Sequence, residues 1–194
     1  MNLISSTSVI ETGRLVLREH TMQDAKAILE LFGDTEVVRH FGMKPIKSIA
    51  DARQLIEFFQ KSREETGLNR WAVVLKDEDA MVGSIFYTNI ERPYYRAEIG
   101  FLLNRVYWGR GIMREAAERI ISYGFEVMNF NKIQALVSVE NGRSINLIEK
   151  LGFTREGILR EHNFNYVENG FEDMYSFALL ARTSSITSNR KFYE

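Results

Sequence analysis

The chain has 194 residues, with 25 basic and 26 acidic side chains and a formal net charge of −1. This balance excludes a global electrostatic attraction to nucleic acid or to anionic lipid. The sequence contains no cysteine, which excludes disulfides, thiolate catalysis and cysteine-based zinc sites. Hydrophobic residues make up 45% of the chain, enough for one domain with a sizeable core.

No targeting or membrane segment is evident in the sequence. Residues 1–8 lack the basic region and the long apolar core of a signal peptide. No apolar run approaches the roughly 20 residues that a membrane-spanning helix needs. We therefore expect a cytoplasmic protein, monomeric or homodimeric, without a membrane or nucleic-acid partner.

Helix and strand signals alternate along the whole chain. Thr21 and Ser48 precede periodic apolar segments as helix caps, Gly152 stops a helix, and residues 168–170 (Glu-Asn-Gly) are a strong turn signal. Helices are expected over 22–32, 34–41, 49–66, 111–128 and 142–151, and strands over 15–18, 69–76, 81–89, 98–103, 132–139, 153–165 and 171–180.

This order predicts a mixed α/β (α+β) fold in which helices are interleaved among mostly antiparallel strands. We expect residues 11–181 to form a single domain, residues 1–10 a loose arm and residues 182–194 a polar tail.

The most informative stretch is 95–117, where an apolar strand leads into a glycine-bearing helix start. The first N–H groups of a helix have no internal partner and the helix dipole favours negative charge there, so this segment is a candidate anion site. Gly109 and Gly111 allow a phosphate to approach the backbone closely. Their spacing is neither GxGxxG nor GxxxxGK[ST], which argues against a dehydrogenase-type dinucleotide fold and a P-loop.

The segment Trp108-Gly109-Arg110-Gly111-Ile112-Met113 resembles the pyrophosphate loop of the GNAT superfamily of N-acetyltransferases. That loop usually has the pattern Gln/Arg-x-x-Gly-x-Gly/Ala. In the ribosomal-protein acetyltransferase (RimJ/RimL-like) branch, Trp commonly occupies the first place. Met113 departs from the small final residue, which affects the packing of the turn but not its N–H groups.

Three further segments resemble the same family. Residues 139–153 resemble its Asn-x-x-Ser…Glu-Lys-Leu-Gly-Phe segment, residues 11–18 its first strand, and residues 157–173 its closing hairpin. The match runs from about residue 11 to residue 181 in the family's order. It implies the GNAT fold, a central mixed, mostly antiparallel sheet flanked by helices, with acetyl-CoA as co-substrate.

The resemblance implies which residues hold coenzyme A. N–H groups of the glycine loop would bind the pyrophosphate, an apolar strand would pair with the pantetheine arm and direct one N–H at the thioester oxygen, and an asparagine would approach that arm. The alternative interpretation is a tight turn followed by an ordinary core strand. The expected cofactor-binding residues are Phe101, Leu102, Leu103, Trp108, Gly109, Arg110, Gly111, Ile112, Met113, Arg114 and Asn141.

Glu98 and Ser144 are the candidate catalytic residues. Glu98 lies at the polar edge of an apolar strand, where burial would raise its pKa toward that of a useful general base. Its alternative role is a salt bridge with Arg96 or Arg70. Ser144 could donate to the departing thiolate, or it could cap a helix as Asn141 could. Many family members place a tyrosine acid four residues after this serine, where the chain has an isoleucine.

The acceptor is expected to be a primary amine. Glu156, Glu161 and Asp173 lie in the closing hairpin, where the branch forms part of its acceptor site, although each could equally be a solvated surface charge. An α-amino group has a pKa of about 7.7–8.0 and a lysine about 10.4, so an α-amine needs little more than a water relay.

By the resemblance, the first acceptor hypothesis is the N-terminal α-amine of a ribosomal protein. The alternatives are a polyamine or amino-sugar acetyltransferase and a non-catalytic acyl-CoA-binding sensor. The histidines show no metal-ligand spacing, so no metal is assigned.

Overall fold

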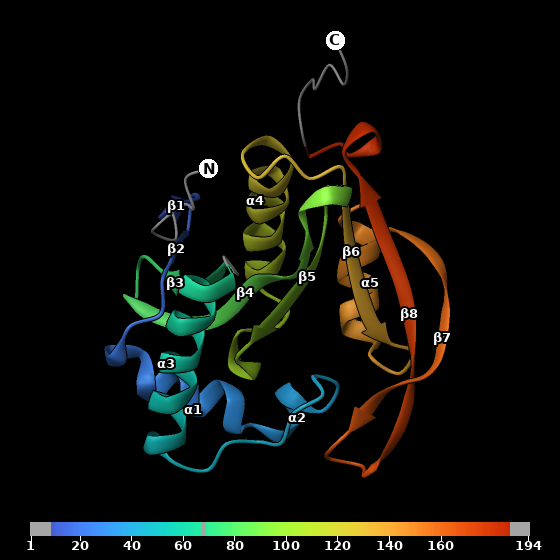
Figure 1. The fold of residues 1–194 in the computed structure, drawn as a ribbon. Coiled ribbons are helices and arrows are strands. Elements are labelled where there is room, and N and C mark those ends of the chain that lie inside the picture. The colour runs from blue at the N-terminus through green and yellow to red at the C-terminus, as the bar shows by residue number, and fades with distance from the viewer. Residues whose placement is uncertain (1–8, 67–68, 187–194) are drawn as a thin grey trace.

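The computed structural model describes residues 9–66 and 69–186. Its described strands form one eight-stranded sheet in the order β1-β2-β3-β4-β5-β6-β8-β7 (Figure 1). The strands are β1 (Ile10–Glu11), β2 (Leu15–Arg18), β3 (Arg70–Leu75), β4 (Ala80–Glu91), β5 (Arg96–Leu103), β6 (Lys132–Ser138), β7 (Thr154–Asn165) and β8 (Gly170–Leu180). The helices are α1 (Ala25–Gly33), α2 (Thr35–Val38), α3 (Ile49–Thr66), α4 (Ile112–Glu126) and α5 (Gly142–Lys150).

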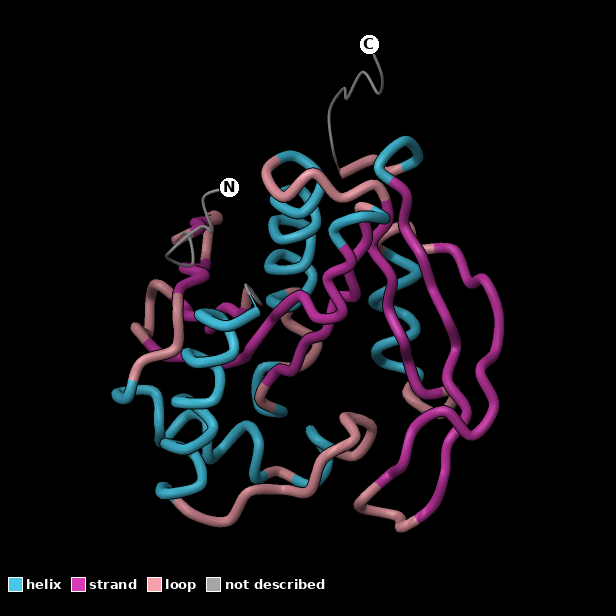
Figure 2. The backbone as a smooth tube through the Cα atoms, in the orientation of Figure 1, coloured by secondary structure: helices cyan, strands magenta, loops and turns pink. Residues whose placement is uncertain are grey.

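Strands β5 and β6 form the one parallel pair among the described strands, and they separate soon after they begin. Their pairing is limited to Arg96 with Lys132, Ala97 with Ile133 and Glu98 with Gln134. Beyond that point β5 continues to pair with β4, and β6 with β8. The two strands diverge toward their C-terminal ends (Figures 1 and 2). Residues 99–103 of β5 therefore have no strand partner on the side of β6.

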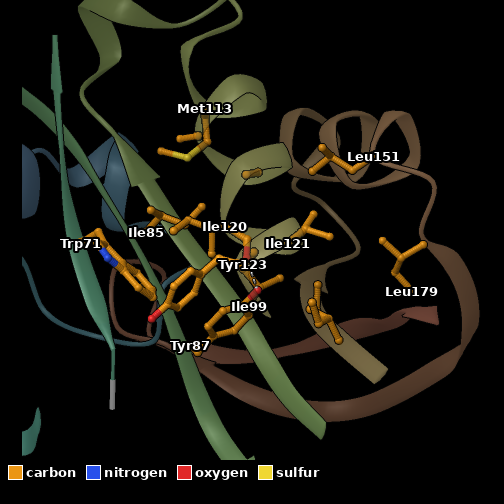
Figure 3. Packing of buried hydrophobic residues seen from close by; sticks show 14 of the residues in the cluster. Trp71, Ile85, Tyr87, Ile99, Met113, Ile120, Ile121, Tyr123, Leu151 and Leu179 are labelled. Carbon is orange, nitrogen blue, oxygen red and sulfur yellow. Dashed lines mark hydrogen bonds between the residues drawn. The ribbon is translucent and has the colours of Figure 1, made fainter. Parts of the chain in front are cut away.

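Helices cover both faces of the sheet. The face covered by α4 and α5, called here the α4 face, holds the larger core (Figure 3). There the ring of Trp71 meets those of Tyr87 and Tyr123 edge-on, with centroids 6.2 and 5.7 Å apart. The Tyr87 hydroxyl is buried but donates to the carbonyl of Ile120 at 2.7 Å, so its burial leaves no unpaired donor.

The opposite face, called here the α1 face, is covered by α1 and α3. Its core is built from Ile28, Phe32 and Ile56 on the helices and from Phe86 and Leu102 on the sheet. Burial of each large apolar side chain contributes about 1.5–3 kcal/mol, so both layers hold the diverging strands in place.

The helix starts follow the expected caps. Thr21 and Asp24 form a capping box before α1, and Ser48 and Asp51 bond reciprocally at the start of α3. The expected helix over 22–32 begins with a short 3-10 turn, Met22–Asp24, before α1. Such tighter turns are frequent at helix ends.

The predicted mixed α/β fold is confirmed. Several boundaries differ. Ile10 belongs to β1 and is buried rather than part of a loose arm. The expected helix over 34–41 is limited to α2, and β5 begins at Arg96, two residues before the expected strand. The rest of that arm up to residue 8 and the end of the tail from residue 187 lie outside the described residues.

Candidate functional site

The glycine loop joins the end of β5 to the start of α4. Gly109 and Gly111 have φ of +77° and +72°, a region that residues with a side chain adopt at a cost of roughly 1–2 kcal/mol. The Trp108 indole N–H donates to the carbonyl of Leu103 at 2.8 Å, which fixes the loop to the end of β5. The start of α4 therefore follows the part of β5 that has separated from β6, and the first amides of a helix are a place where an anion can bind.

Met113, the departure from the expected loop pattern, is accommodated by a glycine. Its side chain is buried in the core of the α4 face (Figure 3). A Cβ placed on Gly83 would lie 3.3 Å from the Met113 terminal methyl group. The missing side chain on β4 thus leaves room for the large one on α4, and the loop keeps its geometry.

Arg14, just before β2 in the chain, bonds both the glycine loop and the first turn of α4. Its Nη1 donates to the carbonyl of Arg110 at 3.0 Å, and its Nε bonds Glu115 in the first turn of α4 at 2.6 Å. Thr12 also donates to Glu115, at 2.6 Å. No local sequence pattern marks Arg14, because its partners are 96 and 101 residues away along the chain.

Helix α5 approaches the loop from the other half of the sheet. The guanidinium of Arg143 lies 4.5 Å from the ring centroid of Trp108. The Asn141 side chain accepts from the backbone N–H of Ser144 at 3.1 Å, so the capping alternative is confirmed for Asn141. Ser144 gives its N–H and not its hydroxyl to this cap. Ile148 is fully buried in the core and has no ionisable group, so it cannot act as an acid.

The strand that would pair with the pantetheine arm alternates between the two cores. Leu102 packs on the α1 face, whereas Phe101 and Leu103 pack on the α4 face. The side chains of residues 101–103 are thus used in packing, and the backbone edge toward β6 is what they offer to a ligand.

Glu98 lies on the α1 face. Every second side chain of a strand points to the same face, and Glu98 is four residues before Leu102, which packs on that face. Burial raises the pKa of Glu98, and the hydrogen bond from Asn89, at 3.0 Å, offsets part of that rise. The salt-bridge alternative is not found: Arg96 pairs with Glu91, and Arg70 stacks between aromatic rings. The raised pKa expected from the sequence is therefore confirmed in direction.

The three expected acceptor carboxylates do not form one cluster. Glu156 forms an ion pair with Lys132 at 2.8 Å. Lys132 is the first residue of β6, where this strand is still paired with β5. Asp173 accepts from the backbone N–H of Glu161 at 2.8 Å, which holds an irregular part of β7. Two of the three thus have structural partners, and the side chain of Glu161 is exposed.

A different carboxylate, Glu172 on β8, is the centre of a polar cluster on the α1 face. Its side chain is 8% exposed. One oxygen bonds His40 Nδ1 and the Ser138 hydroxyl, both at 2.9 Å, and the other accepts from Asn163 at 2.6 Å. These four residues come from four separate segments, so no sequence motif contains them.

Comparison with known proteins identifies the family. The domain described as "Acetyltransferase (GNAT) domain" matches residues 14–154. The chain belongs to the GNAT acetyltransferase family. A protein of Bacillus licheniformis named "Uncharacterized N-acetyltransferase p20" is 34% identical over 171 residues, covering 88% of this chain and 95% of that one. Sequence similarity and fold thus both support an N-acetyltransferase of the GNAT type.

More distant relatives have different acceptors in their names. Spermidine N(1)-acetyltransferase of Escherichia coli is 28% identical over 148 residues, 76% of this chain and 77% of that protein. The solved structure of ribosomal-protein-S5-alanine acetyltransferase from Vibrio fischeri has a TM-score of 0.74 at 23% identity, covering 92% of this chain and 99% of that one. Mycobacterium smegmatis RimJ, solved with CoA-disulfide, has a TM-score of 0.83 at 18% identity over 94% of this chain and 93% of its own.

No helix in the described ranges is long and apolar enough to cross a membrane. Within residues 9–66 and 69–186, no three histidine or carboxylate side chains gather into a group that could hold a metal ion.

Proposed function

We propose that this GNAT enzyme transfers the acetyl group of acetyl-CoA directly to the N-terminal α-amine of a protein, with ribosomal proteins as the first candidates. The observation that carries the proposal is the divergence of β5 from β6, together with the N-terminus of α4, to which β5 leads through the glycine loop. It combines an open strand edge with an anion site, the two features that an acyl-CoA requires.

The residues present fit coenzyme A. The amides of residues 109–114 suit the pyrophosphate, and Arg110, Arg114 and Arg143 supply positive charge around the loop. The backbone of residues 101–103 suits the amide-bearing pantetheine arm and can direct one N–H at the thioester oxygen. When bound, the thioester supplies the activated acetyl group.

Glu98 is the proposed acceptor of the proton that the ammonium group must lose before it can attack. Its raised pKa brings it closer to neutrality, where proton transfer from an amine is effective. An α-amine is only about one pKa unit above neutral pH, so a modest base is sufficient for it. Ser144 is the proposed donor to the departing thiolate.

The acceptor region favours a singly charged amine over a polyamine. A polyamine carries several positive charges, and a site for it needs several unpaired carboxylates. Here Glu156 pairs with Lys132, Asp173 binds backbone, and Glu172 already accepts three hydrogen bonds. This supports the α-amine, although the spermidine acetyltransferase is a relative.

The test is release of coenzyme A thiol from acetyl-CoA in the presence of three acceptor panels. These panels are N-terminal peptides of ribosomal proteins, polyamines and amino sugars. We expect peptides with a free α-amine to give thiol release and the same peptides with a blocked α-amine to give none. Turnover of polyamines or amino sugars without turnover of peptides would overturn the acceptor assignment.

A further inference from the structure

The segment that follows α2 crosses from one half of the sheet to the other. Arg39 bonds Glu168 in the β7–β8 hairpin, and His40 bonds Glu172 on β8. A Cβ on Gly42 would lie 2.8 Å from the Asn163 side-chain oxygen, so the backbone of this segment touches β7 as well. Residues 39–42 therefore form a bridge between α2 and the hairpin (Figure 1).

This bridge is attached beside the opening between β5 and β6. Glu98 pairs with Gln134, so four residues further along each strand Leu102 and Ser138 lie at the same level on either side of the divergence. Ser138 donates to Glu172, which in turn holds His40. The cluster thus lies on the β6 side of the divergence, on the same face of the sheet as Glu98.

Glu172 determines the tautomer of His40. Burial tends to raise the pKa of Glu172, but the hydrogen bonds from His40, Asn163 and Ser138 outweigh it, and the pKa is lowered. An ionised carboxylate can only accept, so Nδ1 of His40 carries the hydrogen. In the neutral imidazole this leaves Nε2 as an acceptor with a free lone pair.

Nε2 of His40 is available for a ligand. No described residue is bonded to it, and the His40 side chain is 15% exposed. The charged group in contact with the imidazole is Glu172 on β8, and the neighbouring contact of the bridge joins Arg39 to Glu168 in the hairpin. Arg39 and Glu168 are paired with each other, so Glu172 is the charge bonded directly to the imidazole.

Acetylation of an ammonium group removes two protons from the nitrogen. The nitrogen loses one proton before it attacks the carbonyl carbon and a second after the N–C bond has formed. The C–S bond then breaks with its electron pair on sulfur. One of the two protons ends on the coenzyme A sulfur and the other in water, which balances the reaction. Glu98 accounts for one of the two protons that leave the nitrogen.

We propose that His40 Nε2 accepts the second proton from the acceptor amine, with Glu172 as the residue that positions the imidazole. The proposal rests on the proposed acetyltransferase function and on the position of the His40–Glu172 pair on the same face of the sheet as Glu98. General-base groups of this kind contribute about 10²–10⁴ to the rate.

The test is the thiol-release rate of His40→Ala with and without added imidazole. We expect kcat to fall at least ten-fold, with the KM for acetyl-CoA unchanged, and imidazole to restore a substantial part of the loss. Glu172→Gln should also lower kcat, but imidazole should not restore it, because the native His40 still fills the site.

Glu168→Gln is the matched control, because it breaks the neighbouring contact between the bridge and the hairpin but leaves Glu172 and His40 intact. It should keep the wild-type rate. His40→Asn, which retains an N–H donor for Glu172, replaces His40→Ala if that variant does not fold.

Wild-type kcat in His40→Ala, or a loss that imidazole does not restore, would overturn the role of His40. An absence of turnover by the wild-type enzyme with every amine would instead refute the proposed function itself.

Discussion

Glu98 and Glu172 show how residue environment separates two carboxylates on one face of the sheet. Glu98 is largely buried with one hydrogen-bond donor, Asn89, and its pKa is raised. Glu172 is also buried but accepts from three donors, and its pKa is lowered. The difference lies in the number of donors, which suits one carboxylate to accept a proton and the other to remain charged.

Glu98→Gln should make the protein more stable and less active. The folded-state pKa of Glu98 lies above its unfolded value, so the ionised carboxylate destabilises the fold at neutral pH and not in acid, below the unfolded pKa. We expect a higher Tm for the variant at pH 7, a gain that shrinks as the pH falls toward about 4.5. The rate of thiol release at pH 7 should fall.

Calorimetric scans of both proteins between pH 4 and pH 8 measure the stability difference, and thiol-release assays measure the rate. An unchanged rate at every pH would remove Glu98 as a proton acceptor. A stability difference that does not vary with pH would contradict its raised pKa.

At the scale of elements, α4 and its loop combine local and distant determinants. The caps, the two glycines and the turn at residues 168–170 act within a few residues, so the sequence predicts the elements and the glycine loop. Arg14 and Glu115 are 101 residues apart, and His40 and Glu172 are 132 apart. Such contacts depend on the register of the sheet and the path of connecting segments, which no local pattern contains.

The roles of Asn141 and Glu156 depend on the elements around them, which only the structure shows. Asn141 is equally plausible from sequence as a cap or as a ligand, and the bond from Ser144 shows that it is a cap. Glu156 has the charge expected of an acceptor residue, but β8 and β7 place it beside Lys132.

Arg14→Ala should weaken acetyl-CoA binding more than it weakens the fold. The Arg14–Glu115 pair is partly exposed, and such pairs contribute about 0.2–1 kcal/mol to stability. Loss of the bond to the Arg110 carbonyl and of a positive charge beside the loop should raise the Kd about 5- to 30-fold, equivalent to about 1–2 kcal/mol.

Titration calorimetry with acetyl-CoA measures this change. Arg96→Ala is the matched control, because its pair with Glu91 has a similar length, 2.7 Å, and lies at the opposite end of β5. Equal Kd values for both variants would contradict the tethering role of Arg14.

At the scale of the whole molecule, the sheet consists of two halves joined by a short parallel contact. Strands β1–β5 and β6–β8 meet through three residue pairs on β5 and β6. The layers of helices and the bridge of residues 39–42 hold the halves together elsewhere. A ligand lying along the open edge of β5 would add backbone hydrogen bonds where the sheet itself provides none.

The most direct test of this account is amide hydrogen exchange with and without acetyl-CoA. We predict that acetyl-CoA slows exchange at residues 101–103 on β5 and at residues 109–114 at the start of α4, with little change in β1–β3. Binding of acetyl-CoA with no protection in either of these segments would contradict the assignment of the diverging strands and the glycine loop as the coenzyme A site.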